Sequence, residues 1–196
     1  PAAWAHMGPV APPRAPLAGL PFANTSPDPE NEYFADGISE ELLDVLSDVD
    51  GLKVASRTSS FAFKGKDVGI GEVARTLGVA HVLEGSVRKQ GRRVRITAQL
   101  IDTGSDQHLW SETYDRELDD IFTVQEEIAR SIAGALSGPM GLAVGASKVE
   151  VAQATGDLQA YEAYLRGRQL FHQRGAGLVD ARRLLEDAVE RDPAFA

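Results

Sequence analysis

Apolar and polar side chains alternate strictly in one stretch near the middle of the chain. Its apolar members are Val94, Ile96, Ala98 and Leu100, and its polar members are Arg93, Arg95, Thr97 and Gln99. Successive side chains of a β-strand point to opposite faces, so this period of two predicts a strand with one dry and one hydrated face. Such a strand belongs to a sheet, and the rest of the chain has to supply the other strands and the helices that cover it.

The patterns beside this strand predict a three-stranded meander. Residues 80–89 and 107–114 have the composition of strands, and the turn sequences Gln90-Gly91 and 102–106 separate them from the central strand. A helix follows: Thr123, with Glu126 three residues later, forms a capping box in front of apolar residues at helical spacing.

The first part of the chain predicts a β-α-β crossover. The apolar run 17–22 and residues 52–56 are typical of strands, and apolar residues recur at helical spacing over 36–49 between them. A second short helix is expected over 69–77, ended by Gly78.

These elements predict the α/β (α+β) class, with a mixed sheet of about five strands packed with about three helices. The domain covers residues 17–137. It follows a proline-rich linker over residues 1–16, and the glycines and proline between Gly138 and Val151 indicate a flexible hinge over 138–156. Residues 157–196 have an entirely helical pattern that predicts a hairpin of two helices.

The composition excludes several classes of function. The chain has no cysteine, which excludes disulfides, Cys-ligated zinc and thiol catalysis. A formal net charge of −9 repels phosphates, so nucleic acid is disfavoured as a partner. No apolar run approaches the ~18 residues that a membrane span needs, so no span is expected within the chain.

Several segments resemble the TolB-like amino-terminal domains that are joined to tetratricopeptide repeats in bacterial adenylate cyclase-like, kinase and transcription-regulator proteins. The resemblance rests on residues 82–88 (VLEGSVR), 93–102 (RVRITAQLID), 108–116 (HLWSETYDR), 120–122 (DIF) and 33–38 (YFADGI). It implies a regulatory or interaction domain without catalytic activity of its own.

The carboxyl-terminal hairpin resembles one tetratricopeptide repeat. Gly167, Ala181, Leu185, Ala188 and Pro193 match the positions of that motif, although the break at 175–177 adds about two residues to its usual length. One repeat cannot bury its own apolar face. We therefore expect either that the array continues beyond Ala196, or that the hairpin packs on the α/β domain or on a second copy of the chain.

No set of residues predicts a catalytic, metal or cofactor site. The four histidines have no neighbouring ligand at metal spacing, and His81 and His108 are expected to pack across strands. Ser56, Ser59 and Ser60 are expected to form a turn or a cap, and the pairs Glu40-Glu41 and 119–120 are expected at helix starts. The sequence thus predicts no enzyme activity, no catalytic residues, no metal and no cofactor.

Two groups of residues are candidates for binding. Arg88, Lys89, Arg92, Arg93 and Arg95 crowd one hairpin, where they form either a solvated surface, a docking surface for an acidic protein, or a contact with nucleic acid or lipid head groups. The second group, Arg57, Trp110 and Tyr114, predicts a groove for a small ligand, with core packing as the alternative for the two aromatic residues.

The sequence therefore predicts a non-catalytic regulatory or protein-interaction module that docks a partner or passes a signal to an effector domain outside the chain. The alternative is a small-molecule sensor with a cleft near Arg57, Trp110 and Tyr114. A protein partner is expected and self-association is possible. The proline-rich start is compatible with a preceding membrane span and thus with the periplasmic side of a membrane; a cytoplasmic location is the alternative.

Overall fold

The computed structural model describes residues 15–140, 149, 151 and 155–195. It contains one mixed six-stranded sheet with helices packed on it, which confirms the predicted fold class. In chain order the elements are β1 (Ala15–Gly19), β2 (Ala23–Asn24), α1 (Glu32–Ser47), β3 (Leu52–Val54), α2 (Arg57–Phe61), α3 (Ile70–Leu77), β4 (His81–Gln90), β5 (Arg93–Asp102), β6 (Gln107–Glu117), α4 (Ile121–Met140), α5 (Leu158–Gln173) and α6 (Leu178–Arg191).

The strand order is β3-β1-β4-β5-β6, and the short β2 also pairs with β4. Strand β1 runs parallel to both β3 and β4, so β1-α1-β3 is the crossover that the sequence predicts. The long ribbons β4, β5 and β6 form the predicted antiparallel meander, with a bulge between Leu100 and Ile101.

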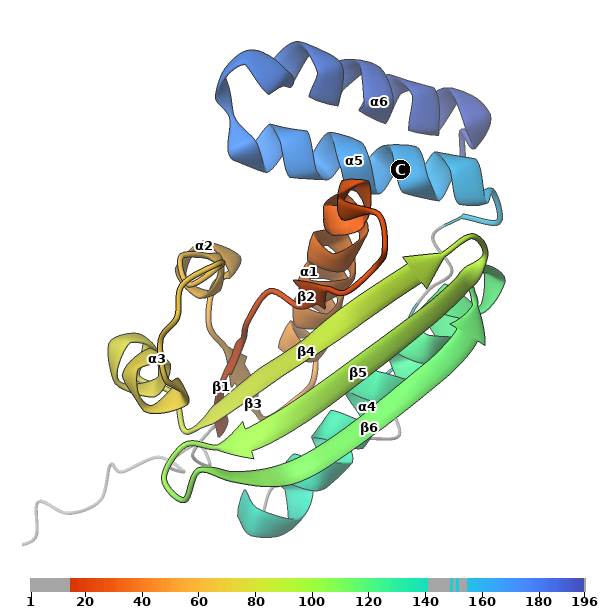
Figure 1. The fold of residues 1–196 in the computed structure, drawn as a ribbon. Coiled ribbons are helices and arrows are strands. Elements are labelled where there is room, and N and C mark those ends of the chain that lie inside the picture. The colour runs from red at the N-terminus through yellow and green to blue at the C-terminus, as the bar shows by residue number, and fades with distance from the viewer. Residues whose placement is uncertain (1–14, 141–148, 150, 152–154, 196) are drawn as a thin grey trace, which may run out of the picture.

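The two faces of the sheet are covered differently (Figure 1). Leu83 of β4 packs into the main core with α1, α4 and α5, whereas its neighbour Val82 packs into a small cluster with Val73 of α3. Because adjacent strand residues point to opposite faces, α3 covers the second face only at the start of β4. Farther along, that face carries polar side chains such as Thr97 and Thr113, whose hydroxyls lie 3.0 Å apart.

Several elements differ from the sequence-based expectation. Strand β1 begins at Ala15 and includes Pro16, although the linker was expected to reach residue 16; Pro16 lacks an N–H but its carbonyl accepts a hydrogen bond from Ala80. Helix α2 forms where a loop was expected, and Ser56 caps it by accepting a bond from the Ser59 amide. Helix α4 begins at Ile121, so Thr123 lies inside the helix and is not its N-cap.

Helix α4 continues to Met140, past the expected end of the domain at residue 137. Most of the predicted hinge, residues 141–148, 150 and 152–154, lies outside the described residues, as do residues 1–14 of the predicted linker. The hairpin α5–α6 lies beside α1 (Figure 1). Gly167 permits its two helices to approach closely, because a Cβ there would meet Leu185 at 2.9 Å.

No helix in the described part of the chain is both long and apolar enough to cross a membrane.

Candidate functional site

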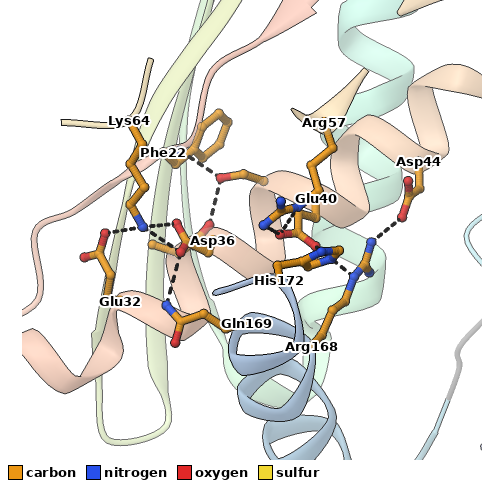
Figure 2. A network of polar contacts seen from close by, with 12 residues as sticks. Phe22, Glu32, Asp36, Glu40, Asp44, Arg57, Lys64, Arg168, Gln169 and His172 are labelled. Atoms are coloured by element: carbon orange, nitrogen blue, oxygen red, sulfur yellow. Dashed lines mark hydrogen bonds and ion pairs between the residues drawn. The ribbon is translucent and has the colours of Figure 1, made fainter. Parts of the chain in front are cut away.

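Helix α1 carries a row of acidic residues along one side. Glu32, Asp36, Glu40 and Asp44 are spaced four apart, which places them above one another on a helix. Asp36 and Glu40 are buried, with 5% and 2% of their surfaces exposed. Burying a carboxylate is costly unless cations or hydrogen-bond donors reach it. Three other segments supply those partners to this acidic row (Figure 2).

Glu40 is contacted by two arginines and a histidine from two helices. Arg57 of α2 donates a hydrogen bond from Nε to its Oε1. From α5, Arg168 Nε lies 2.8 Å and His172 Nε2 lies 3.4 Å from Oε2. Burial lowers the pKa of His172, and the charges of Arg57 and Arg168 act in the same direction against the attraction of Glu40. Arg168 also pairs with the exposed Asp44 at 2.9 Å.

Asp36 joins the loop after α2 to helix α5. Lys64 Nζ lies 2.5 Å from both carboxylate oxygens, and Gln169 Nε2 donates to Oδ2 at 3.1 Å. Lys64 also pairs with Glu32 at 2.7 Å. Burial lowers the pKa of Lys64, but the two carboxylates outweigh this effect and raise it overall. One lysine is therefore fixed to two members of the acidic row.

Glu41, which is half-buried, belongs to a second group whose other members, Gln125 and Tyr161, are buried. Tyr161 of α5 donates from its hydroxyl to Glu41 Oε2 at 2.5 Å, and Gln125 of α4 donates to the same oxygen at 2.5 Å. Burial raises the pKa of Glu41, and the two hydrogen bonds oppose the shift. Burial and the neighbouring carboxyl likewise raise the pKa of Tyr161. Helices α1, α4 and α5 therefore meet at one carboxyl group.

Apolar packing, a cation–π contact and a further ion pair also join the hairpin to the α/β domain. Gly37 in the middle of α1 faces Leu165 of α5, and a Cβ at residue 37 would lie 2.7 Å from its Cδ2. Arg166 lies over the Tyr33 ring at 4.5 Å from the centroid, and Lys89 of β4 pairs with Glu162 at 2.8 Å. The hairpin thus packs on the α/β domain, one of the arrangements expected from the sequence.

The contacts at this junction attach α2 and α5 to α1. Each buried carboxylate faces cations or hydrogen-bond donors, and the histidine beside Glu40, His172, forms no hydrogen bond to a serine in the described part of the chain. Among the described residues, no group of three or more His, Asp or Glu side chains could hold a metal ion. What the arrangement can do chemically is fix α1, α2 and α5 in one geometry.

The structure separates the residues of the basic hairpin. Arg88, Arg93 and Arg95 line a shallow cleft of about 410 Å³ together with Asp115, which pairs with Arg93 at 3.2 Å and with Arg95 at 2.6 Å. We call this the arginine cleft. Lys89 points away from it toward α5, and Arg92 pairs with Asp119 on the far side of the turn.

Arg57 is not brought together with Trp110 and Tyr114. Arg57 contacts Glu40 and stacks on Phe61, 4.2 Å from the ring centroid, whereas both aromatic residues lie on the edge strand β6 and pack against the core. The hydroxyl of Tyr114 donates to Glu112 at 2.8 Å, and burial raises its pKa to about 12. None of these three residues lines the arginine cleft.

Sequence reasoning missed the acidic row. It placed Glu40-Glu41 at a helix start, where the helix dipole would stabilise them, but α1 begins at Glu32 and both residues lie in its middle. The error followed from expecting the helix to begin near Asp36. The signal was present, since four acidic residues at a spacing of four define one side of a helix. Their partners on α5 lie more than a hundred residues away and have no local signature.

Comparisons with known proteins show that the chain is similar to part of a larger protein. No protein-family model matches the chain. Over 193 residues, 98% of its length, the chain is 46% identical to a protein of Rhizobium meliloti (strain 1021) named "Putative adenylate cyclase 3". It spans only 32% of that protein, so the similarity concerns about a third of the relative.

Solved structures resemble parts of the chain. TolB from Acinetobacter baumannii matches with 18% identity and a TM-score of 0.48, over 64% of this chain and 29% of that one. The LpoB C-terminal domain from Escherichia coli matches with 18% identity and a TM-score of 0.42, over 53% of this chain and 82% of that one. TolB and the LpoB domain are thus among the structural neighbours of the chain. The tetratricopeptide assignment stays a prediction.

Proposed function

We propose that the chain is a non-catalytic regulatory module of an adenylate cyclase-like protein, in which the α/β domain passes a signal to the rest of that protein through the α5–α6 hairpin. The observation that carries the proposal is the buried junction on α1. Arg57, Arg168 and His172 converge there on Glu40, and no convergent nucleophile, base and metal set accompanies them in the described residues.

The physical basis is the cost of separating these groups. A buried carboxylate that loses its cations leaves an uncompensated charge, at a cost of about 3–5 kcal/mol. The hairpin therefore moves with α1 as long as the ion pairs hold. A displacement of α1 or of the loop at Lys64 is transmitted to Arg168 and Gln169. This route passes through packed helices and does not require transmission along the predicted hinge.

The test is a chimera of the Rhizobium meliloti relative in which this chain replaces the matching third, followed by measurement of cyclic AMP formation from ATP. The variant Arg168→Met, which removes one cation from Glu40, should change the rate about fivefold or more, in line with typical coupling energies. The control Arg182→Met removes an arginine of α6 that pairs only with an exposed glutamate. Equal rates in the three chimeras would exclude signal transfer through the junction, and cyclic AMP formation by the isolated chain would exclude a non-catalytic role.

The arginine cleft is the docking surface of this module for an acidic protein segment. Arg88 has no ion-pair partner among the described residues, and Asp115 is shared between Arg93 and Arg95, so the cleft keeps an excess of positive charge. A chain of net charge −9 repels acidic partners elsewhere, which confines their approach to this place.

Titration with a fluorescent poly-glutamate peptide measures this docking. The double variant Arg88→Gln/Arg95→Gln should weaken binding about tenfold or more, and added salt should weaken the binding of the unmodified protein. The matched control Arg182→Gln/Arg183→Gln removes two exposed arginines from α6. Equal weakening by both double variants would show a general charge effect and remove the assignment to this cleft.

A further inference from the structure

A second cleft lies between the loop after α2 and the sheet, and none of the sequence-predicted site residues lines it. We call it the loop cleft. It encloses about 600 Å³, within the range of small-ligand sites. Its walls include apolar side chains of the loop and α3, and its floor is the face of β4 and β5 that α3 leaves uncovered. The lining comprises Leu20–Asn24, Glu32, Phe63–Lys66, Val68, Ile70, Glu84–Ser86 and Gln99.

The cleft exists because strand pairing is interrupted beside β4. Strand β1 pairs with β4 up to Leu83, and β2 pairs with it again from Ser86. Between them the Phe22 ring packs over Gly85, where a Cβ would meet ring atoms at 3.0 Å and fall on the Thr97 carbonyl oxygen. Glycine at residue 85 thus lets Phe22 lie close to the strand and fixes one wall of the cleft.

Two opposite charges in this cleft take part in no ion pair among the described residues, although Lys66 Nζ lies 5.9 Å from the centroid of the Phe63 ring. Glu84 is half-buried on the floor, next to Gln99 across the strand pair, and Lys66 is exposed on the loop. Neither forms an ion pair with another described residue, whereas Lys64 and Glu32 in the same lining pair with each other. The two paired and two unpaired charges give the cleft no net charge. Its chemistry suits a ligand that presents both a cation and an anion.

We propose that the loop cleft binds a small zwitterion with an apolar body, of the class of apolar amino acids and dipeptides. The ligand ammonium faces Glu84, its carboxylate faces Lys66, and its side chains contact Phe63, Val68 and Ile70. A dipeptide of this class fits within the volume of the cleft.

The loop cleft is connected to the junction on α1. Lys64 lines the cleft and binds Asp36, and the Phe22 amide in the opposite wall donates to Ser39 of α1 at 2.8 Å (Figure 2). Asp36 in turn accepts a hydrogen bond from Gln169 of α5. The regulatory consequence of binding rests on the function proposed above. Binding itself does not depend on that function.

Isothermal titration calorimetry of the full chain with L-leucine and L-leucyl-L-leucine tests the proposal. Both should bind, whereas N-acetyl-L-leucine, which lacks the ammonium, and L-leucinamide, which lacks the carboxylate, should bind about tenfold more weakly. Absence of binding by both zwitterions would overturn the proposal, and equal affinity for the blocked analogues would overturn the assigned ligand class.

The variants Glu84→Gln and Lys66→Gln assign the binding to the cleft. Each should weaken the affinity for L-leucyl-L-leucine about tenfold, while Glu72→Gln and Lys53→Gln, which alter exposed charges outside the cleft, should leave it unchanged. Circular dichroism spectra establish that each variant is folded. Unweakened binding by the two cleft variants would place the ligand elsewhere and refute the assignment. Because the measurement does not involve cyclic AMP, it separates this inference from the function proposed for the module.

Discussion

Substitution of Gly37 by alanine tests directly whether α5 is docked on α1. In an exposed helix interior, replacing glycine with alanine stabilises by about 1 kcal/mol. At Gly37 the new methyl group would lie 2.7, 3.1 and 3.2 Å from three atoms of Leu165. Leu165 is 1% exposed and cannot move into solvent, so relief requires repacking of the junction. Overpacking of this kind costs about 1–3 kcal/mol, which leaves a net loss of up to about 2 kcal/mol.

Gly134 provides the matched control. It lies in α4, and a Cβ there would meet nothing within 4 Å. Gly134→Ala should therefore raise the free energy of unfolding by about 1 kcal/mol, and the two alanine variants should differ by about 1–3 kcal/mol. Urea unfolding of the full chain, followed by far-ultraviolet circular dichroism, measures both.

The double variant Gly37→Ala/Leu165→Ala gives the decisive comparison. Removing the leucine side chain alone costs about 2–5 kcal/mol, but it also removes the atoms that the new methyl group meets. In that background Gly37→Ala should become stabilising, which a double-mutant cycle detects as a coupling between the two sites. If Gly37→Ala stabilises the unmodified protein as much as Gly134→Ala does, α5 does not pack against α1 in solution and the junction is not a fixed connection.

Three further predictions concern the junction and the sheet. Arg168→Met should lower the free energy of unfolding by about 1–3 kcal/mol, because Glu40 loses one of its two arginines, whereas Arg182→Met, at an exposed pair, should cost at most about 0.5 kcal/mol; urea unfolding measures both. The raised pKa of Glu41 means that the folded state holds its proton more tightly than the unfolded state, so this stabilisation is complete below pH 4.5 and is lost as pH rises through the raised pKa. Between pH 4.5 and 7 the unmodified protein should therefore lose more free energy of unfolding than Glu41→Gln, and an equal pH dependence of the two would contradict the burial of this carboxyl. Gly85→Ala should lower the melting temperature, at a cost of about 1–3 kcal/mol, because its methyl group meets a carbonyl oxygen and an aromatic ring; an unchanged melting temperature would contradict the close packing beside β4.

Local patterns in the sequence were sufficient for most of the sheet. The alternation from Arg93 to Gln99 and the turn at Gln90-Gly91 determine the meander, because both depend on neighbouring residues only. Gly78 ends α3 in the left-handed conformation, φ 66°, as expected from its position after the apolar residues. The crossover from β1 to β3 was predictable for the same reason, since it needs only two strands and the helix between them.

Contacts between distant segments could not be predicted in this way. The acidic row is visible in the sequence, but its cations come from α2 and from α5, and nothing near Arg168 or Gln169 identifies Asp36 and Glu40 as their partners. The same limit applies to the basic hairpin. Five basic residues close together in sequence were treated as one surface, although the strand geometry sends Lys89 to α5 and leaves three arginines in a common cleft.

The parallel position of β1 has a consequence for the order of assembly during synthesis. The meander β4-β5-β6 closes through tight turns, but β1, made first, lacks its β4 neighbour until residues 81–83 have left the ribosome. The carboxylates of α1 meet their partners on α5 later still, because Arg168 and Gln169 are synthesised more than a hundred residues after α1. Arg57 and Lys64 follow α1 closely and can pair with Glu40 and Asp36 first, but the full dehydration of these acids is deferred until α5 supplies Arg168 and Gln169.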